Sequence, residues 1–129
     1  MPTPVVRFRV DFGRHEAIGP GKIALLEQIA ASGSLSQAAR ELRMSYRRAW
    51  QLLESLNGSF SDRVVITSKG GRGGGGAALT PFGVQLVSRY RAFDKDVQAR
   101  AARCFRDLAT KTRARSAPRA APVRRLSER

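Results

Sequence analysis

Residues 34–56 read SLSQAARELRMSYRRAWQLLESL, and this stretch decides the fold. It holds two short amphipathic segments, each preceded by a serine that suits the first position before a helix, Ser34 and Ser45. Only about three residues separate the two segments. Two short helices joined so closely are typical of a helix-turn-helix motif.

The apolar residues of the stretch recur at helical spacing. The expected inward faces are Leu35, Ala38, Ala39 and Leu42 in the first helix, and Ala49, Leu52, Leu53 and Leu56 in the second. Gln37, three residues after Ser34, predicts a capping box, and Asn57-Gly58 predicts the end of the second helix. An earlier helix is predicted from Lys22 to Gly33, with an inward face of Ile23, Leu26, Ile29 and Ala30.

A short hairpin is predicted after the motif. Val64-Val65-Ile66 and Ala77-Ala78-Leu79 are the two strand candidates, and between them six glycines fall within residues 70–76. A glycine-rich hairpin at this place favours the wing of a winged helix-turn-helix domain. A phosphate-binding enzyme loop is disfavoured, because no GxxxxGK[ST] pattern occurs. Upstream, Val6, Phe8, Val10 and Phe12 alternate with polar residues and predict a half-buried strand.

A long last helix is predicted to begin at Thr80-Pro81 and to run to about Leu108. Its apolar positions follow steps of three and four residues, close to a heptad seam. The seam consists of Leu86, Tyr90, Phe93, Val97, Ala101, Cys104 and Leu108. So small a body cannot cover the whole helix, so the seam predicts a homodimer; the alternative is a helix folded back on its own domain.

The predicted fold is therefore mainly α with a small β wing, a winged helix-turn-helix with a long C-terminal dimerisation helix. Residues 1–109 are expected to form this domain, with the long helix at about 81–108. Residues 110–129 are rich in Ala, Arg, Ser and Pro, and a disordered basic tail is expected there.

Charge points to the partner. The chain has 24 Lys and Arg against 10 Asp and Glu, a net charge of +14, and the tail accounts for less than half of the excess. Such a balance favours a polyanionic partner, either nucleic acid or an anionic membrane surface. The second helix of the motif is the candidate recognition helix, because its first turn holds Tyr46, Arg47 and Arg48. The candidate contacts with double-stranded DNA are Ser36, Gln37, Ser45, Tyr46, Arg47, Arg48, Gln51, Lys69 and Arg72. Trp50 is expected to be core or half-buried.

Other classes of function find little support in the residues. No catalytic set is visible: His15 is the only histidine, in a turn region, and Cys104 is expected to pack on the seam. One cysteine permits no intrachain disulfide, and no ligand cluster predicts a metal or cofactor. No apolar run or signal peptide predicts a membrane role, so the cytoplasm is the default compartment.

Residues 33–39, 44–50 and 70–80 together resemble the N-terminal DNA-binding domain of ModE, the molybdate-responsive transcriptional regulator, and more distantly LysR-type winged helices. The resemblance covers about residues 5–108. It implies a homodimer packed through the long helix and control of genes for molybdate uptake and molybdenum enzymes. Full-length members sense molybdate with C-terminal domains. Here only the basic tail follows Leu108, so a stand-alone form is expected, and molybdate ligands are assigned to no residue.

Two functions are carried forward. The first is a dimeric, sequence-specific regulator, with a separate molybdate-binding partner left open. The alternative is an architectural protein that compacts nucleic acid regardless of sequence, through its net charge and Arg-rich tail.

Overall fold

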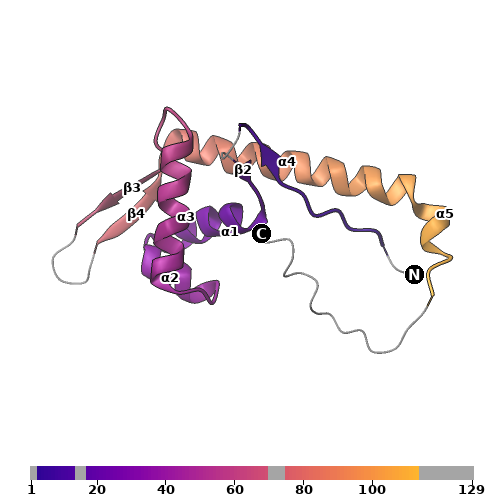
Figure 1. The fold of residues 1–129 in the computed structure, drawn as a ribbon, viewed down its shortest axis with the longest axis horizontal. Coiled ribbons are helices and arrows are strands. Elements are labelled where there is room, and N and C mark those ends of the chain that lie inside the picture. The colour runs from indigo at the N-terminus through magenta and orange to yellow at the C-terminus, as the bar shows by residue number, and fades with distance from the viewer. Residues whose placement is uncertain (1–2, 14–16, 70–74, 114–129) are drawn as a thin grey trace.

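The computed structural model describes residues 3–13, 17–69 and 75–113. Three short helices gather at one end of the molecule, a β-hairpin projects from them, and a long helix extends away in the opposite direction (Figure 1). The elements run β1 (Val10–Asp11), β2 (Ala17–Ile18), α1 (Pro20–Ser32), α2 (Leu35–Glu41), α3 (Tyr46–Ser59), β3 (Val65–Ser68), β4 (Gly76–Leu79), α4 (Pro81–Cys104) and α5 (Arg106–Ala109). The mainly helical fold with small hairpins, a helix-turn-helix and a long C-terminal helix is confirmed.

The caps of the motif form as predicted at the serines. The Ser34 side chain accepts a hydrogen bond from the Gln37 amide at 3.1 Å, and the Ser45 side chain accepts one from the Arg48 amide at 3.0 Å. Helix α1 ends at Gly33, which has a left-handed φ of 72°. The turn between α2 and α3 places Arg43 at φ 58°, a conformation that most side chains avoid.

Helix α1 and the two helices of the motif, α2 and α3, share one apolar core. It contains the inward residues of α2 and α3, together with β-strand residues and Tyr90 of α4. One expectation for α1 is wrong, since Ala30 is exposed. Leu25, which the predicted face did not include, is fully buried. α1 is apolar on more than one side because it packs on α2, α3, α4 and β4, so a single-stripe pattern underestimates its burial.

The wing, which we define as the hairpin of β3 and β4, is antiparallel, with Val65 paired to Leu79 and Ser68 to Gly76. Both of its strands are tied to the helices. Asn57, near the end of α3, accepts hydrogen bonds from the Val64 and Val65 amides at 2.8 and 3.0 Å and donates one to the Val65 carbonyl at 3.1 Å. α3 continues through Asn57 to Ser59, so the predicted stop at Asn57-Gly58 is two residues early.

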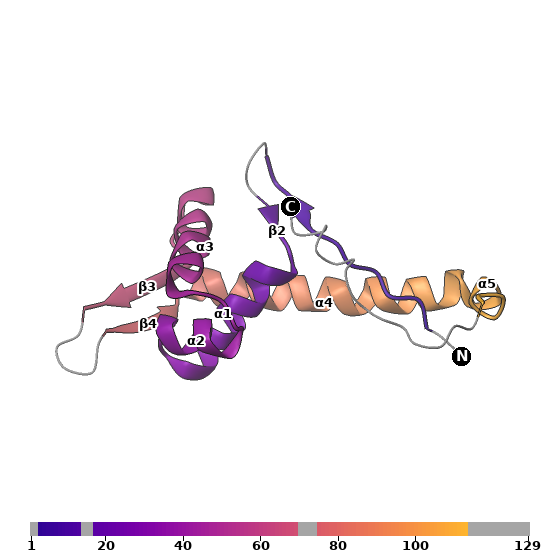
Figure 2. The same cartoon turned by 60° about the horizontal axis from the view of Figure 1, so that its bottom comes forward.

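Helix α4 begins where predicted, with Thr80 as its cap: the Thr80 hydroxyl accepts a hydrogen bond from the Gly83 amide at 3.0 Å. It runs for 24 residues, about 36 Å at 1.5 Å per residue. It ends earlier than predicted, at Cys104. Phe105 interrupts the helical path, and the short α5 follows in a new direction (Figure 2).

The N-terminal segment satisfies its alternating pattern in an unexpected way. Only Val10–Asp11 is a strand, paired with β2, while the residues before it run extended along α4 (Figures 1 and 2). Val6, Phe8 and Val10 are half-buried and their polar neighbours are exposed. The predicted long strand is therefore wrong, since helix α4 covers this apolar face. Phe12, expected on the same face, is 57% exposed.

Candidate nucleic-acid interface

Helix α3 presents a polar outer face opposite its core contacts. Ala49, Leu53 and Leu56 are buried, so the residues projecting the other way include Arg47 and Gln51, both exposed. Ser45 and Tyr46 are exposed at the start of the helix. Recognition helices contact base edges mostly from their first turns, and Arg and Gln side chains suit guanine and adenine edges. This face has the chemistry that base reading requires.

Trp50 lies on this exposed side of α3 and not in the core. Its side chain is 39% exposed, and Tyr46, one turn earlier on the same face, is 55% exposed. Of the two expectations for Trp50, core or half-buried, only the second fits: the buried stripe passes through Ala49 and Leu53, and Trp50 falls beside it. Glu54, which the sequence reasoning did not single out, is also exposed on this side, one turn beyond Trp50.

Arg48 projects away from Trp50, because residues two positions apart in a helix point to nearly opposite sides. It lines a groove of about 790 Å³ between α3, the start of α1 and the N-terminal segment. We call this the basic groove; its cationic lining residues are Arg7, Arg9, Lys22 and Arg48. No carboxylate lines it among residues 3–13, 17–69 and 75–113.

Lys22 is one of the cations that line the basic groove. Its ammonium donates hydrogen bonds to the Ala17 carbonyl and the Ser55 hydroxyl, each at 3.0 Å. Burial, followed by repulsion from Arg48 and Arg9, lowers the pKa of Lys22 below its usual 10.5. The groove therefore gathers four cationic side chains on the side of α3 away from the wing, of which Arg9 is ion-paired with Asp11 at 3.0 Å. Sequence spacing gave no means to find this feature.

At the start of α2, Ser36 and Gln37 are exposed. Gln37 does not close the predicted capping box with its side chain: its amide oxygen accepts a hydrogen bond from Arg40 at 3.0 Å, and the Ser34 amide donates to the Ser32 hydroxyl instead. The Gln37 side chain is thus directed along the outside of α2. Ser36 lies beside it, with its hydroxyl 3.4 Å from that of Ser34.

Lys69 is exposed directly after β3, at the outer end of the wing. Arg72 and most of the glycine run, residues 70–74, lie outside the described residues. His15 lies outside them as well. The candidate contacts that the structure describes thus come from α2, α3 and the wing.

The predicted seam of α4 divides into two parts. Near the motif, Leu86 is half-buried and Tyr90 is buried. Further along, Ala101 is buried and Val97 half-buried, but Phe93 and Leu108 are 51% and 55% exposed, and Cys104 is exposed rather than packed. Phe105, also exposed, adjoins this part. The outer half of the helix therefore keeps an open apolar face.

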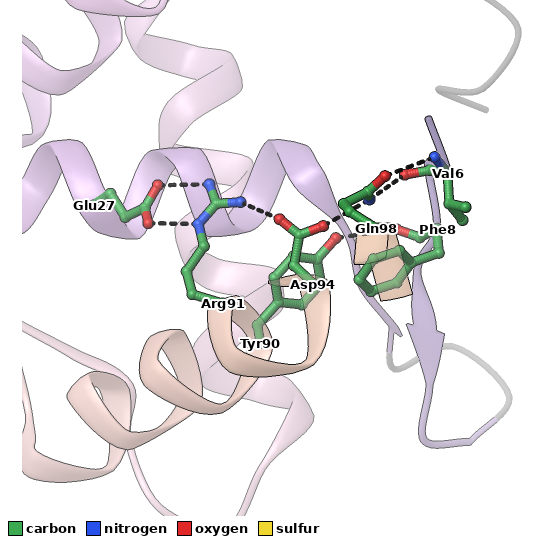
Figure 3. A network of polar contacts seen from close by, with 7 residues as sticks. All are labelled: Val6, Phe8, Glu27, Tyr90, Arg91, Asp94 and Gln98. Atoms are coloured by element: carbon green, nitrogen blue, oxygen red, sulfur yellow. Dashed lines mark hydrogen bonds and ion pairs between the residues drawn. The ribbon is translucent and has the colours of Figure 1, made fainter. Parts of the chain in front are cut away.

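A polar network joins α1, α4 and the N-terminal segment (Figure 3). The Arg91 guanidinium donates two hydrogen bonds to the Glu27 carboxylate, at 2.7 and 2.8 Å, and one to Asp94 at 3.1 Å. Gln98 exchanges two hydrogen bonds with the Val6 backbone, at 2.8 and 2.9 Å. The network fixes the direction of α4 relative to the motif.

The charges in this network perturb one another. The hydrogen bonding between Arg91 and Glu27 lowers the pKa of Glu27. The same interaction raises the pKa of Arg91. Next to them, the Tyr90 hydroxyl donates to the Phe8 carbonyl at 3.0 Å and the two rings stack at 4.9 Å. Burial raises the pKa of the Tyr90 phenol. These groups are engaged in packing, which identifies the network as structural.

Two further features bear on function. Among the described residues no group of three or more His, Cys, Asp or Glu side chains is placed to hold a metal ion. Within the same ranges, no helix is long and apolar enough to cross a membrane.

This arrangement, a capped recognition helix beside a hairpin, defines a helix-turn-helix DNA-binding domain. Residues 21–84 match the family of bacterial regulatory helix-turn-helix proteins of the lysR type. The proteins of that family are transcription regulators rather than enzymes.

Its relatives narrow the class further. The chain is 37% identical over 111 residues to the molybdenum-pterin-binding protein MopB of Rhodobacter capsulatus, which covers 78% of this chain and 41% of the relative. It is 34% identical over 95 residues to the molybdenum transport protein ModE of Azotobacter vinelandii, covering 74% and 35%. It is 42% identical over 71 residues to the DNA-binding transcriptional dual regulator ModE of Escherichia coli K12, covering 55% and 27%.

The match is to the N-terminal portion of these relatives, as the resemblance predicted. The chain spans well under half the length of each of them.

Proposed function

We propose that this protein is a sequence-specific transcriptional regulator that binds operator DNA as a homodimer, through α3 and the wing. One observation carries the proposal: the exposed face of α3, with Arg47 and Gln51 outward, lies beside a wing that Asn57 fixes to the same helix. The recognition helix is suited to the major groove, and Lys69 on the wing to a neighbouring phosphate. Ser36 and Gln37 at the start of α2 are suited to phosphates on the other side.

The roles of the two adjacent arginines differ in this proposal. Arg47 faces outward from α3 and contacts base edges, whereas Arg48 lines the basic groove and contacts the phosphate backbone. Phosphate contacts position a protein on the duplex, and base contacts give it specificity. Replacing Arg47 therefore reduces discrimination between sequences, and replacing Arg48 reduces affinity for all of them.

The dimer is supported by the open apolar face of α4. An apolar hollow of about 320 Å³ beside Phe93 is lined by Val10, Phe12, Ile18, Leu86, Arg89, Tyr90 and Phe93. Exposed apolar surface of this kind marks an interface. A second copy of the chain fits best, because α4 carries a heptad-like apolar seam that can pack against the same helix of another copy. A two-fold dimer also matches a palindromic operator.

The target genes are proposed from the relatives. Two of them are named for molybdenum and a third is a transcriptional regulator, so genes for molybdenum transport or molybdenum enzymes are the proposed targets. A separate molybdate-binding partner would supply the signal. A regulator of this kind acts on the chromosome, in the cytoplasm. Mapping its bound sites across the genome tests the assignment, which fails if molybdenum genes are absent from the bound set.

The decisive experiment begins with selection of a preferred duplex from a random library. The proposal expects that duplex to bind much more tightly than random DNA at physiological salt. Arg47→Ala should reduce the ratio of the two affinities, whereas Arg113→Ala, which removes the same charge from an exposed position at the far end, should leave the ratio unchanged. Equal binding of selected and random duplexes would instead support the architectural function, which the net charge of +14 favours.

The dimer is tested by sedimentation equilibrium. Phe93→Glu places a charge in the proposed interface and should give a monomer. Ser88→Glu, at an exposed position on another face of α4, is the matched control and should remain a dimer. A wild-type chain that is monomeric at micromolar concentration would refute this part of the proposal.

A further inference from the structure

The recognition helix exposes two aromatic side chains that its polar residues do not explain. Tyr46 and Trp50 are four residues apart, so their rings lie one above the other on one face of α3. We call this pair the aromatic edge. Exposed aromatic area is costly in water, and a Trp and a Tyr together on the DNA-facing side point to a ligand with an apolar group.

The aromatic edge is on the side of α3 nearest the wing. Asn57 follows Trp50 by seven residues, two helical turns, and therefore shares its face; the Asn57 side chain bonds β3. Arg48, in contrast, points into the basic groove on the opposite side. Arg47 and Gln51 lie between these two sides. The helix thus presents three strips in order, aromatic, hydrogen-bonding and cationic. Glu54 is exposed one turn beyond Trp50, at the end of the aromatic side.

Each strip matches a different part of the major groove. Hydrogen-bonding side chains read base edges, and cations contact the phosphates at the border of the groove. The C5-methyl of thymine is the apolar group that the major groove displays. We propose that Tyr46 and Trp50 bind thymine methyl groups, so that the preferred operator carries thymines on the side of each half-site that faces the wing. This inference rests on the proposed sequence-specific function.

The test uses deoxyuridine, which lacks only the C5-methyl and keeps the pairing of thymine. Each thymine of the selected duplex is replaced in turn, and dissociation constants are measured for the full chain at fixed salt. Burial of one methyl group corresponds to about a three- to fivefold change in affinity. The wild type should show this loss at one or two thymines per half-site.

Variants assign the loss to the aromatic edge. Trp50→Ala or Tyr46→Ala should bind the thymine duplex more weakly and show no further loss with deoxyuridine at the same position. Trp50→Phe, which keeps an aromatic ring, should retain part of the thymine preference. It is the control for a folding defect in Trp50→Ala. Val84→Ala removes exposed apolar surface outside α3, away from the proposed dimer interface, and should retain all of the preference.

Two results would overturn the inference alone: tight, selective binding to a duplex in which no thymine is sensitive to deoxyuridine, or a sensitivity that both alanine variants keep. A selection that enriches no sequence would overturn the proposed function, and this inference with it.

Discussion

The first turn of α4 packs so closely against the Val64 backbone that Gly83 has no room for a side chain. The substitution Gly83→Ala tests this close approach. Gly83 is buried in the first turn of α4, and a Cβ built there overlaps the Val64 carbonyl oxygen and lies 3.3 Å from the Cβ of Leu79. The Val64 oxygen cannot move freely, because it accepts hydrogen bonds from the Thr80 amide at 3.0 Å and from the Thr80 hydroxyl at 3.2 Å.

The magnitude follows from these contacts. Alanine in place of glycine within a helix normally stabilises by about 1 kcal/mol. Forcing a methyl group into a packed site costs about 1–3 kcal/mol, and disturbing the Thr80 cap costs about 1 kcal/mol more. We therefore expect Gly83→Ala to lower the free energy of unfolding by about 1–3 kcal/mol. For a domain of this size that corresponds to a melting temperature lower by roughly 5–20 °C.

The assay is thermal unfolding followed by circular dichroism, at one protein concentration because a dimer would make the midpoint concentration-dependent. Gly58→Ala is the matched control: Gly58 lies in α3, and a Cβ there meets nothing within 4 Å. This variant should be as stable as wild type or up to about 1 kcal/mol more stable. A Gly83→Ala protein that melts at or above the wild-type temperature would refute the close approach of α4 to Val64.

Three other changes have defined outcomes. Asn57→Ala removes two hydrogen bonds to the first residue of the wing and one to Val64 just before it, and should destabilise by about 2–3 kcal/mol in urea unfolding, with weaker DNA binding. Because Arg91 lowers the pKa of Glu27, the ion pair stabilises the fold above pH 4.5, and this contribution is lost as the pH falls below that value. Glu27→Gln should therefore make the free energy of unfolding less dependent on pH in this range. The difference should be about 1 kcal/mol or less, because the pair is exposed. Arg48→Gln should make DNA binding less dependent on salt by about one phosphate contact, at every sequence alike.

Each of these has a result that counts against it. An Asn57→Ala variant with wild-type stability would mean that the wing is held by its own pairing. A stability curve between pH 3 and 5 that is identical in wild type and Glu27→Gln would show that the ion pair contributes nothing measurable. An unchanged salt slope in Arg48→Gln would remove the basic groove from the DNA interface.

The sequence predicted the parts of the fold that depend on local chemistry. Ser34, Ser45 and Thr80 cap helices as expected, because a side-chain oxygen and the amide three residues on are enough to define a cap. The strands beside the glycine run were also placed correctly, since β-branched residues and turn residues signal them directly.

The failures came from tertiary contacts. The alternation of residues 6–12 predicted a strand, but its apolar side is covered by α4, and periodicity does not reveal what covers a face. Trp50 was expected to be core or half-buried, and only its register on α3 shows that it lies beside the buried stripe. The basic groove combines Arg7 with Arg48, and no local pattern links residues so far apart.

The wing is held from two directions. Asn57 holds its first strand to the end of α3, and the Gly33 carbonyl, at the turn that precedes α2, accepts a hydrogen bond from the Ala77 amide of its second strand at 2.9 Å. The distance between α3 and the wing is thus set before any ligand binds, and the two elements have a fixed spacing. A duplex that fits it must already have the right spacing between neighbouring grooves, or must be twisted to reach it. Under the proposed function, flexible base steps beyond the contacted bases should raise affinity, so that the mechanics of the DNA would contribute to the choice of operator.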